Sequence, residues 1–328
     1  MYKILVADKI AEAGLAQLRA AGDVKFDVRA GLSPEELGAV VGDYDGMLIR
    51  SAVKVTSAAL SKPGRLKAIA RAGVGVDNVD LGAATEAGVL VLNTPDANTI
   101  STAEHTIALM LALHRRVVEG DSHVRGGGWN RSAYEGAQVA GRTLGIVGLG
   151  RIGRAVARRA TGLEMKVIAF DPFLKGSSAM DGSVAMVSSL DELLATADCI
   201  TLHASLAPDT KRMIGAAQLA KMKPGARLIN CARGALLDEN ALADALNTGR
   251  IAGAAIDVYE NEPPKDSPLL TAKNIVLTPH LAASTAEAQL RVSTDAVESL
   301  LAYLKNGEVR SAVNTPRTRA SAGRSGAA

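Results

Sequence analysis

The stretch TLGIVGLGRIGRAVA, residues 143–157, decides the fold class of this chain. A run of apolar residues leads into glycines at 148, 150 and 153, and an alanine-rich segment that favours a helix follows. In a strand-turn-helix unit, Gly148 permits the tight turn, Gly150 lets a pyrophosphate approach the backbone, and Gly153 lets the helix pack closely on the strand. The spacing therefore predicts a dinucleotide site at the start of a helix.

An acidic residue after the next apolar run supports the same interpretation. Asp171 follows Gly153 by eighteen residues and ends the segment KVIAFD. A carboxylate at this place accepts hydrogen bonds from ribose hydroxyls and repels a 2′-phosphate. We therefore expect the cofactor NAD rather than NADP. A purely structural glycine turn, which is the alternative, gives no reason for the acid.

The pattern on both sides of this stretch predicts an α/β protein with two domains. The chain has 328 residues, and short aliphatic runs alternate with helical segments both before and after residue 98. Such alternation is typical of parallel sheets covered by helices. We predict a Rossmann-type NAD-binding domain, residues 99–283, inserted in a flavodoxin-like substrate-binding domain, residues 1–98 and 284–315, with 316–328 as a disordered tail.

Three helix ends can be read from the sequence. SPEEL, residues 33–37, predicts a helix start with Ser33 as the N-cap, and Gly307 predicts the end of a last helix that returns to the first domain. Residues 101–116, STAEHTIALMLALHRR, predict a long helix that links the domains, with Ser101 and Glu104 as a capping box. This linking helix is more apolar than one buried face requires, which predicts a homodimer or a higher homo-oligomer.

Composition excludes several classes of partner. The formal charge of +3 equals the contribution of Arg317, Arg319 and Arg324, which lie in a tail that has no acid. The rest of the chain is balanced and shows no basic stripe, so we expect no nucleic-acid partner. The N-terminus lacks the features of a signal peptide, and no apolar run approaches membrane-spanning length, so we expect a cytoplasmic protein without a membrane partner.

The cysteines and histidines give no sign of a disulfide or a metal site. Cys199 and Cys231 lie inside strand-like runs, where free cysteine behaves as a small buried apolar residue. No cluster of histidine and cysteine occurs at ligand spacing, so we expect no metal.

Three further residues have side chains that could carry out the dehydrogenation of an alcohol. Arg233 in NCARG follows a buried strand, where a guanidinium can clamp a carboxylate and polarise a carbonyl; pairing with a surface acid is its structural alternative. His280 ends the strand NIVLTPH and can exchange a proton near neutral pH, although a lone histidine is more often structural. Glu262 in YENEPP can orient the imidazole and stabilise its protonated form. Without His280, the sequence around Glu262 would indicate only an acidic residue in a loop.

These motifs occur together and in one order. GLGRIG with Asp171, INCARG, AIDVYENEPP and LTPHLAAST resemble the NAD-dependent D-isomer-specific 2-hydroxyacid dehydrogenases across residues 1 to about 315. IARAGVGVDNVD and VLNTPDANTISTAEHTIALMLAL are most similar to the branch that oxidises D-3-phosphoglycerate, the first step of serine biosynthesis. The resemblance implies that Arg233, Glu262 and His280 are the catalytic trio, and members of the family commonly dimerise through the linking-helix region.

The resemblance also implies the ligand contacts. The cofactor would meet Gly148, Gly150, Arg151, Ile152, Gly153, Asp171, Cys231, Ala232, Asp257 and Val74, with Asp257 near the nicotinamide carboxamide. The small-molecule substrate would meet Arg50, Ser51, Gly73, Val74, Gly75 and Asn98, and Arg131 matches a position that can hold a substrate phosphate.

Departures from the family pattern keep alternatives open. Ala204 and Ser205 stand where a threonine and a proline are common, and Val74 replaces a common threonine. Glyoxylate or hydroxypyruvate reduction, or another D-2-hydroxyacid, therefore remains an alternative activity, and an NAD-sensing scaffold similar to corepressors remains an alternative of another class. The sequence ends about where a regulatory serine-binding domain begins in longer members, so we expect no feedback by serine through such a domain.

Overall fold

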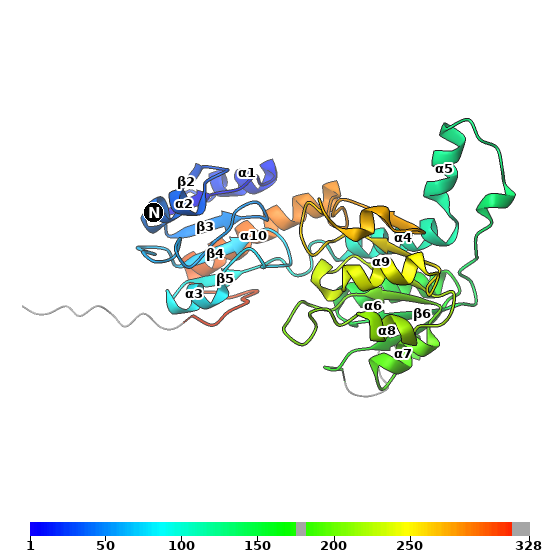
Figure 1. Ribbon diagram of the computed structural model, residues 1–328. Coiled ribbons are helices and arrows are strands. Elements are labelled where there is room, and N and C mark those ends of the chain that lie inside the picture. The colour runs from blue at the N-terminus through cyan, green and yellow to red at the C-terminus, as the bar shows by residue number, and fades with distance from the viewer. Residues whose placement is uncertain (175–181, 317–328) are drawn as a thin grey trace, which may run out of the picture. The chain divides into compact units, whose positions relative to one another are not determined.

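The computed structural model describes residues 1–174 and 182–316 of the chain. The chain divides into two compact units, one formed by Met1–Asn98 and Thr285–Ala328 and the other by Thr99–Ser284 (Figure 1). The tail expected at 316–328 lies outside the described residues from 317 onward. No described helix has both the length and the apolar character that crossing a membrane requires.

The first unit contains a five-stranded parallel sheet in the order β2-β1-β3-β4-β5. This is the flavodoxin-like order, in which the sheet grows outward in both directions from its first strand. The strands are β1 (Tyr2–Val6), β2 (Val24–Val28), β3 (Gly46–Ile49), β4 (Ala68–Arg71) and β5 (Leu90–Leu92).

Helices cover both faces of this sheet. On one face, Leu18 of α1 and Val297 of α10 pack in a core with strand residues such as Ile4. On the opposite face, Leu37 of α2 and Ala84 of α3 pack in a core with strand residues such as Leu5. The expected capping box at Ser33 is present, because its side chain and that of Glu36 each accept the other's backbone N–H. The helices are α1 (Glu12–Ala20), α2 (Pro34–Val40), α3 (Leu81–Glu86) and α10 (Ala286–Asn306), the last ending before Gly307 as expected.

The second unit contains a seven-stranded parallel sheet in the order β12-β11-β10-β9-β6-β7-β8. The chain reverses its direction of growth between β6 and β9, which lie side by side, and ligands of such sheets bind at this switch point. The strands are β6 (Thr143–Val147), β7 (Lys166–Phe170), β8 (Ala185–Met186), β9 (Cys199–Leu202), β10 (Arg227–Asn230), β11 (Gly253–Ile256) and β12 (Ile275–Leu277).

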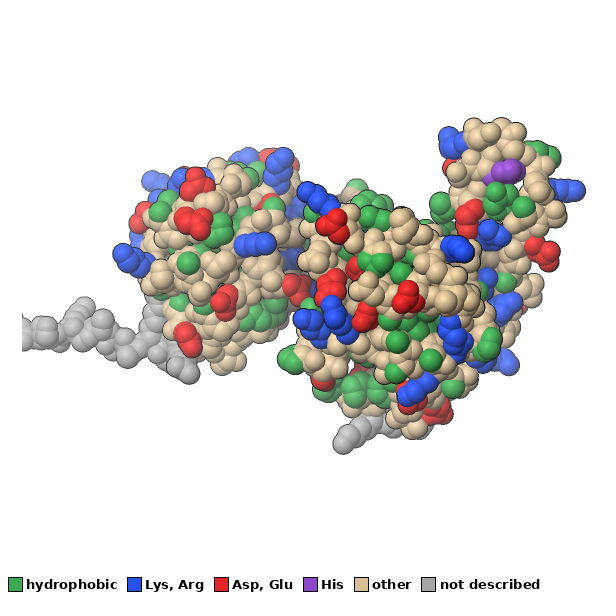
Figure 2. Space-filling view, viewed as in Figure 1, with side chains coloured by type: hydrophobic (Ala, Val, Ile, Leu, Met, Phe, Trp, Pro, Cys, Tyr) green, Lys and Arg blue, Asp and Glu red, His purple; other side chains and the backbone are tan. Residues whose placement is uncertain are grey.

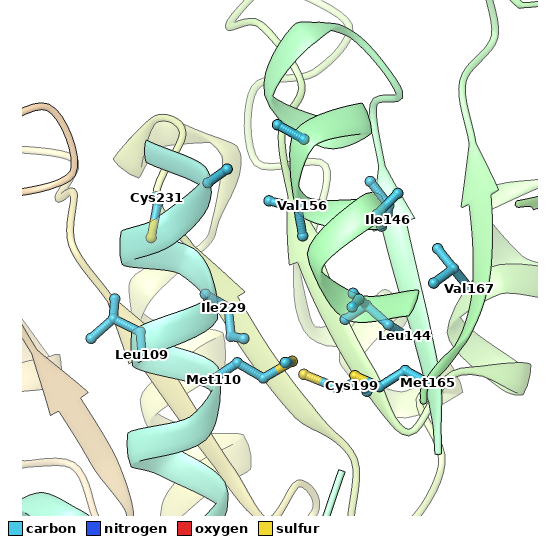
Figure 3. Close-up of a cluster of buried hydrophobic side chains, with 14 of the residues drawn as sticks. Leu109, Met110, Leu144, Ile146, Val156, Met165, Val167, Cys199, Ile229 and Cys231 are labelled. Atoms are coloured by element: carbon cyan, nitrogen blue, oxygen red, sulfur yellow. The ribbon is translucent and has the colours of Figure 1, made fainter. Parts of the chain in front are cut away.

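Two layers of helices enclose this second sheet. Figure 3 shows Met110 of α4 beside Ile229, and Leu109 of α4 and Val156 of α6 belong to the same core. A separate core holds the helices of the opposite face. The helices of the unit are α4 (Thr99–His114), α5 (Val117–Arg125), α6 (Arg151–Gly162), α7 (Leu190–Thr196), α8 (Ala216–Lys221) and α9 (Glu239–Asn247).

Three expectations about local structure are wrong. Helix α4 begins at Thr99, so Ser101 is a buried residue inside the helix and forms no capping box with Glu104. The helix ends at His114 because Arg116 adopts a left-handed conformation, with φ of 52°, and α5 starts after it. Cys231 follows the end of β10 and does not belong to the strand, although it is buried as expected.

Candidate active site

The three glycines after β6 have three different surroundings. Gly148 has a φ of +92°, and a Cβ there would lie 2.8 Å from the carbonyl carbon of His203. A Cβ on Gly153 would lie 2.2 Å from the carbonyl oxygen of Gly148, so helix and strand pack there without space for a side chain. A Cβ on Gly150 would meet no atom of the described residues within 4 Å. Two glycines are thus required by the protein's own packing, and the middle one faces space that a ligand can use.

The start of α6 is suited to a pyrophosphate. Gly150 is its N-cap and provides no side-chain hydrogen bond, so the first N–H groups of the helix remain for an anion. Asp171, after β7, accepts the N–H of Leu149 at 2.9 Å and that of Phe173 at 3.0 Å. Arg151 is exposed and Ile152 partly buried on the first turn of the helix. These residues fit a dinucleotide, with Asp171 in reach of the same loop.

The loop after β10 places Arg233 at the carboxyl edge of the sheet. The buried amide of Asn230 donates to the carbonyl of Arg233 at 2.8 Å, and its oxygen accepts the N–H of Ala232 at 3.0 Å. Gly234 comes next, where an added Cβ would lie 1.9 Å from the carbonyl carbon of Tyr259. The local sequence NCARG therefore folds as a tight turn whose shape depends on asparagine and glycine.

His280 and Glu262 form a hydrogen-bonded pair at the same edge. Nδ1 of His280 lies 2.8 Å from a carboxylate oxygen of Glu262, which leaves Nε2 for another partner. This hydrogen bond is the main reason that the pKa of His280 is raised above 6.5, while burial and the positive charge of Arg233 oppose the rise. Burial would raise the pKa of Glu262, but its contact with His280 lowers it below 4.5. In the structure, Arg233, Glu262 and His280 thus lie close enough for the charges of Arg233 and Glu262 to change the pKa of His280.

Asp257, after β11, is fully buried, and its carboxylate accepts hydrogen bonds from other groups of the protein. One oxygen accepts from the hydroxyl of Thr278 and from the N–H of Leu281, and the other accepts from the N–H of Ala282. The expected contact of Asp257 with the nicotinamide carboxamide remains a prediction. Burial raises the pKa of the neighbouring Cys231 thiol to about 12, so this thiol is neutral.

A histidine that was not among the residues predicted from the sequence, His105, also lies close to this site. His105, Cys231 and Asp257 offer ligand-type atoms that all lie within 4.8 Å of one another. They come from α4, the loop after β10 and the end of β11, so no spacing in the sequence could show the group. The only signal was helical periodicity, because His105 follows Thr102 by three residues and precedes Leu109 by four, and both are buried.

The substrate residues expected in the first unit follow three strands: Arg50 and Ser51 come after β3, Gly73, Val74 and Gly75 after β4, and Asn98 after β5. Arg50 is partly buried, and its guanidinium donates to the carbonyl of Lys9 and to the side chain of Gln289. Ser51 is exposed. Gly73 has a positive φ of 152°, Val74 and Gly75 are partly buried, and the side-chain oxygen of Asn98 is buried without a hydrogen-bond partner among the described residues.

Arg131 lies elsewhere in the second unit, on the exposed segment after α5. A shallow hollow on this segment is lined by Trp129, Asn130, Arg131, Ser132 and Glu135. The role expected for Arg131 in binding a substrate phosphate remains a prediction.

Comparison with known proteins fits this arrangement. Residues 107–282 match the model of the D-isomer specific 2-hydroxyacid dehydrogenase NAD binding domain. A D-3-phosphoglycerate dehydrogenase of Methanocaldococcus jannaschii is 45% identical over 316 residues, which are 96% of this chain and 60% of that relative. The chain therefore spans three fifths of the length of this curated relative.

Two crystal structures are similar to this chain over nearly its full length. One, of a Thermus thermophilus protein, is 38% identical with a TM-score of 0.86 and covers 95% of this chain and 99% of its own. The other, a glyoxylate reductase from Paecilomyes thermophila, is 34% identical with a TM-score of 0.87 and covers 95% and 97%. The two parallel α/β sheets and the NAD-binding domain predicted from the glycine motif are confirmed. The chain belongs to the D-isomer specific 2-hydroxyacid dehydrogenase family.

Proposed function

We propose that this chain oxidises the C2 hydroxyl of a D-2-hydroxyacid with NAD, and that D-3-phosphoglycerate, which yields 3-phosphohydroxypyruvate, is its substrate. The observation that carries the activity is the His280–Glu262 hydrogen bond of 2.8 Å beside Arg233, at the same sheet edge as the glycine loop. Carboxyl edges of doubly wound sheets are where such folds bind their ligands.

Each of these side chains has a task in the oxidation. The glycine loop and Asp171 would hold NAD, which would supply the acceptor for the hydride from C2. Nε2 of His280 takes the hydroxyl proton, since Nδ1 is occupied by Glu262, whose negative charge stabilises the imidazolium that forms. Arg233 holds the substrate carboxylate and polarises the carbonyl that develops at C2.

The phosphate on the substrate is supported by two kinds of observation. The curated relative of Methanocaldococcus jannaschii, nearly half identical over the matched residues, is named D-3-phosphoglycerate dehydrogenase. Arg50 and Arg131 are cations on exposed or partly buried loops, as recognition of a phosphate requires. Glyoxylate or hydroxypyruvate reduction is the second candidate, and the likeness to a glyoxylate reductase favours it.

Steady-state kinetics on paired substrates decide between these two activities. We expect kcat/KM for D-3-phosphoglycerate to exceed that for D-glycerate by roughly 10²-fold or more, because charged hydrogen bonds to phosphate are lost in the second acid. Arg131→Gln should reduce this ratio and leave kcat/KM for D-glycerate unchanged. Equal values for both acids in the wild type would favour the reductase. Binding of NADH without turnover of any 2-hydroxyacid or 2-ketoacid would favour the NAD-sensing scaffold.

We further propose that the chain forms at least a homodimer, with α5 in the contact. None of the residues of α5, all of which the structure describes, is buried, and Figure 1 shows the helix standing away from the sheet of its own unit. Its apolar side chains are exposed, as the green side chains of that segment in Figure 2 illustrate; they are Val117, Val118, Val124 and, beyond the helix, Trp129. The apolar residues of α4, in contrast, are largely buried against their own sheet. Light scattering at micromolar concentration should give a dimer mass or more, and a monomer would contradict this proposal.

A further inference from the structure

His105 of α4 contacts a buried carboxylate next to the proposed active site. Its Nε2 lies 3.2 Å from Oδ1 of Asp257 and 3.2 Å from the hydroxyl of Thr278. The Asp257 side chain has no exposed surface, and that of His105 is 19% exposed. A buried carboxylate needs hydrogen-bond donors around it, and within the described part of the chain His105 is the donor that comes from a different layer of the fold.

Asp257 in turn fixes the turn that carries His280. Its carbonyl accepts the N–H of His280 at 2.9 Å, and its carboxylate accepts the N–H groups of Leu281 at 2.7 Å and Ala282 at 2.9 Å. On the other side of His280, the hydroxyl of Thr278 donates to the same carboxylate at 2.5 Å. The hydrogen bonds of one aspartate therefore enclose His280 from both directions along the chain.

The backbone of His280 needs this support. Its φ is +56°, in the left-handed region that residues other than glycine rarely adopt. Such conformations persist where surrounding contacts determine them, and they cost energy when the contacts are lost. The direction of the imidazole therefore depends on the hydrogen bonds to Asp257.

We propose that His105 is a positioning residue for the reaction: by holding the Asp257 carboxylate, it keeps the turn at 278–282 and so the imidazole of His280 in place. This inference rests on the proposed function. Burial alone would raise the pKa of Asp257, but the hydrogen bonds from His105, Thr278, Leu281 and Ala282 lower it, so the carboxylate remains charged to hold the turn. The charged groups that act on His280 itself are Glu262, Asp257 and Arg233.

A metal ion is a less suitable interpretation of the same three side chains. Both oxygens of Asp257 already accept hydrogen bonds from the protein. Cys231, the third residue, has a pKa raised to about 12 by burial, whereas a metal binds the thiolate. The arrangement is that of a hydrogen-bonded support.

The test compares three substitutions at His105 with one on the same helix. His105→Ala removes the donor, His105→Asn keeps polarity but places its amide short of Asp257, and His105→Gln restores an N–H donor near the position of Nε2. His114→Gln is the matched control, because His114 is a buried histidine of α4 that bonds to the carbonyl of Met110 instead. We expect kcat to fall about 10-fold or more in His105→Ala and His105→Asn, with KM for NAD unchanged, and to recover in His105→Gln.

A second readout does not depend on turnover. The chain has five histidines, so NMR of protein labelled with ¹⁵N-histidine can follow the titration of His280. We expect the pKa of His280 to fall toward 6.5 in His105→Ala and His105→Asn, because the turn loosens and the contact with Glu262 weakens, and to stay at the wild-type value in His105→Gln and His114→Gln.

The outcomes separate this inference from the proposed function. If His105→Ala and His105→Asn keep both the wild-type kcat and the wild-type titration of His280, the positioning role is wrong. A protein that turns over no 2-hydroxyacid, but whose His280 titration changes in these variants, supports the positioning role and refutes the proposed function. Should His105→Ala fail to fold, the polar His105→Asn variant gives the same comparison.

Discussion

The two units share one architecture, a doubly wound parallel sheet, but their carboxyl edges are built differently. In the second unit, ionisable side chains follow the strand ends closely: Asp171 comes directly after β7, and Arg233 and His280 come three residues after β10 and β12. In the first unit, as around Asp257 in the second, buried or partly buried polar side chains hold the backbone of the loops. Asp8 accepts the N–H groups of Arg50 and Ala52, both at 3.1 Å, and Asn78 donates to the carbonyls of Arg50 and Val53 at 2.7 and 2.6 Å.

This difference teaches that the same sheet edge can offer either reactive groups or a shaped backbone. Side chains at strand ends change the protonation and charge of what they meet, whereas a fixed loop offers N–H and carbonyl groups in a set geometry. Substitutions of Arg233, Glu262 or His280 in the second unit should therefore act on kcat, and substitutions that loosen the loops of the first unit should act on KM for the hydroxyacid.

The largest effect is expected at His280. His280→Ala removes the proposed base and should reduce kcat by roughly 10²-fold or more. NADH should still bind with its wild-type Kd, because the glycine loop is unchanged; fluorescence titration measures this. Turnover near the wild-type rate would remove His280 from its role and, with it, the contrast between the two edges.

The next test separates packing from ligand contact within one loop. Gly148→Ala should lower the free energy of unfolding by about 1–3 kcal/mol, because φ is +92° and the Cβ would clash with the backbone of His203. Gly150→Ala should unfold like the wild type in urea, since its Cβ meets only open space, but bind NADH about 10-fold more weakly. Unchanged NADH affinity in Gly150→Ala would show that no pyrophosphate lies there.

A smaller effect is expected from the first unit. Asp8→Asn leaves a single acceptor oxygen where the carboxylate now receives the N–H groups of Lys9, Arg50 and Ala52. The loop loosens, and KM for the hydroxyacid should rise about 3- to 10-fold while the Kd for NADH stays constant. A loss in kcat with an unchanged KM would mean that the first unit also contributes to the chemical step.

The smallest effect is a shift in pH dependence. The pKa of His280 is raised above 6.5, mainly by its hydrogen bond with Glu262. Oxidation needs the neutral imidazole, so kcat/KM should rise with pH through this raised pKa, and ketoacid reduction should show the opposite trend. In Glu262→Gln the midpoint should move to lower pH. A midpoint that stays in place would assign the titration to another group.

Sequence patterns that depend on near neighbours predicted the structure well. The glycines of the loop, the capping box at Ser33 and the helix end at Gly307 each follow from residues within one turn of the chain. Ser101 and Glu104 have the same spacing as a capping box but lie inside α4, because burial of Ser101 and its neighbours extends the helix toward its N-terminus. Tertiary contacts there override a local signal.

The candidate site was predictable only in part for the same reason. The sequence was sufficient to predict Arg233, Glu262 and His280, because each follows an apolar strand or lies in a recognisable motif. His105 has no such context, and its neighbours Asp257 and Cys231 lie more than 100 residues away in the chain. Its role becomes visible only when α4 packs on the sheet.

The return of α10 to the first sheet has a consequence for biosynthesis. Val297 and Leu300 of α10 share a core with Ile4 and Leu48, so this core is incomplete until α10 has left the ribosome. Residues 99–284, by contrast, are contiguous and can fold while synthesis continues. The core of the first unit is therefore completed only after the second unit has been translated, and until then its apolar face lacks the cover of α10.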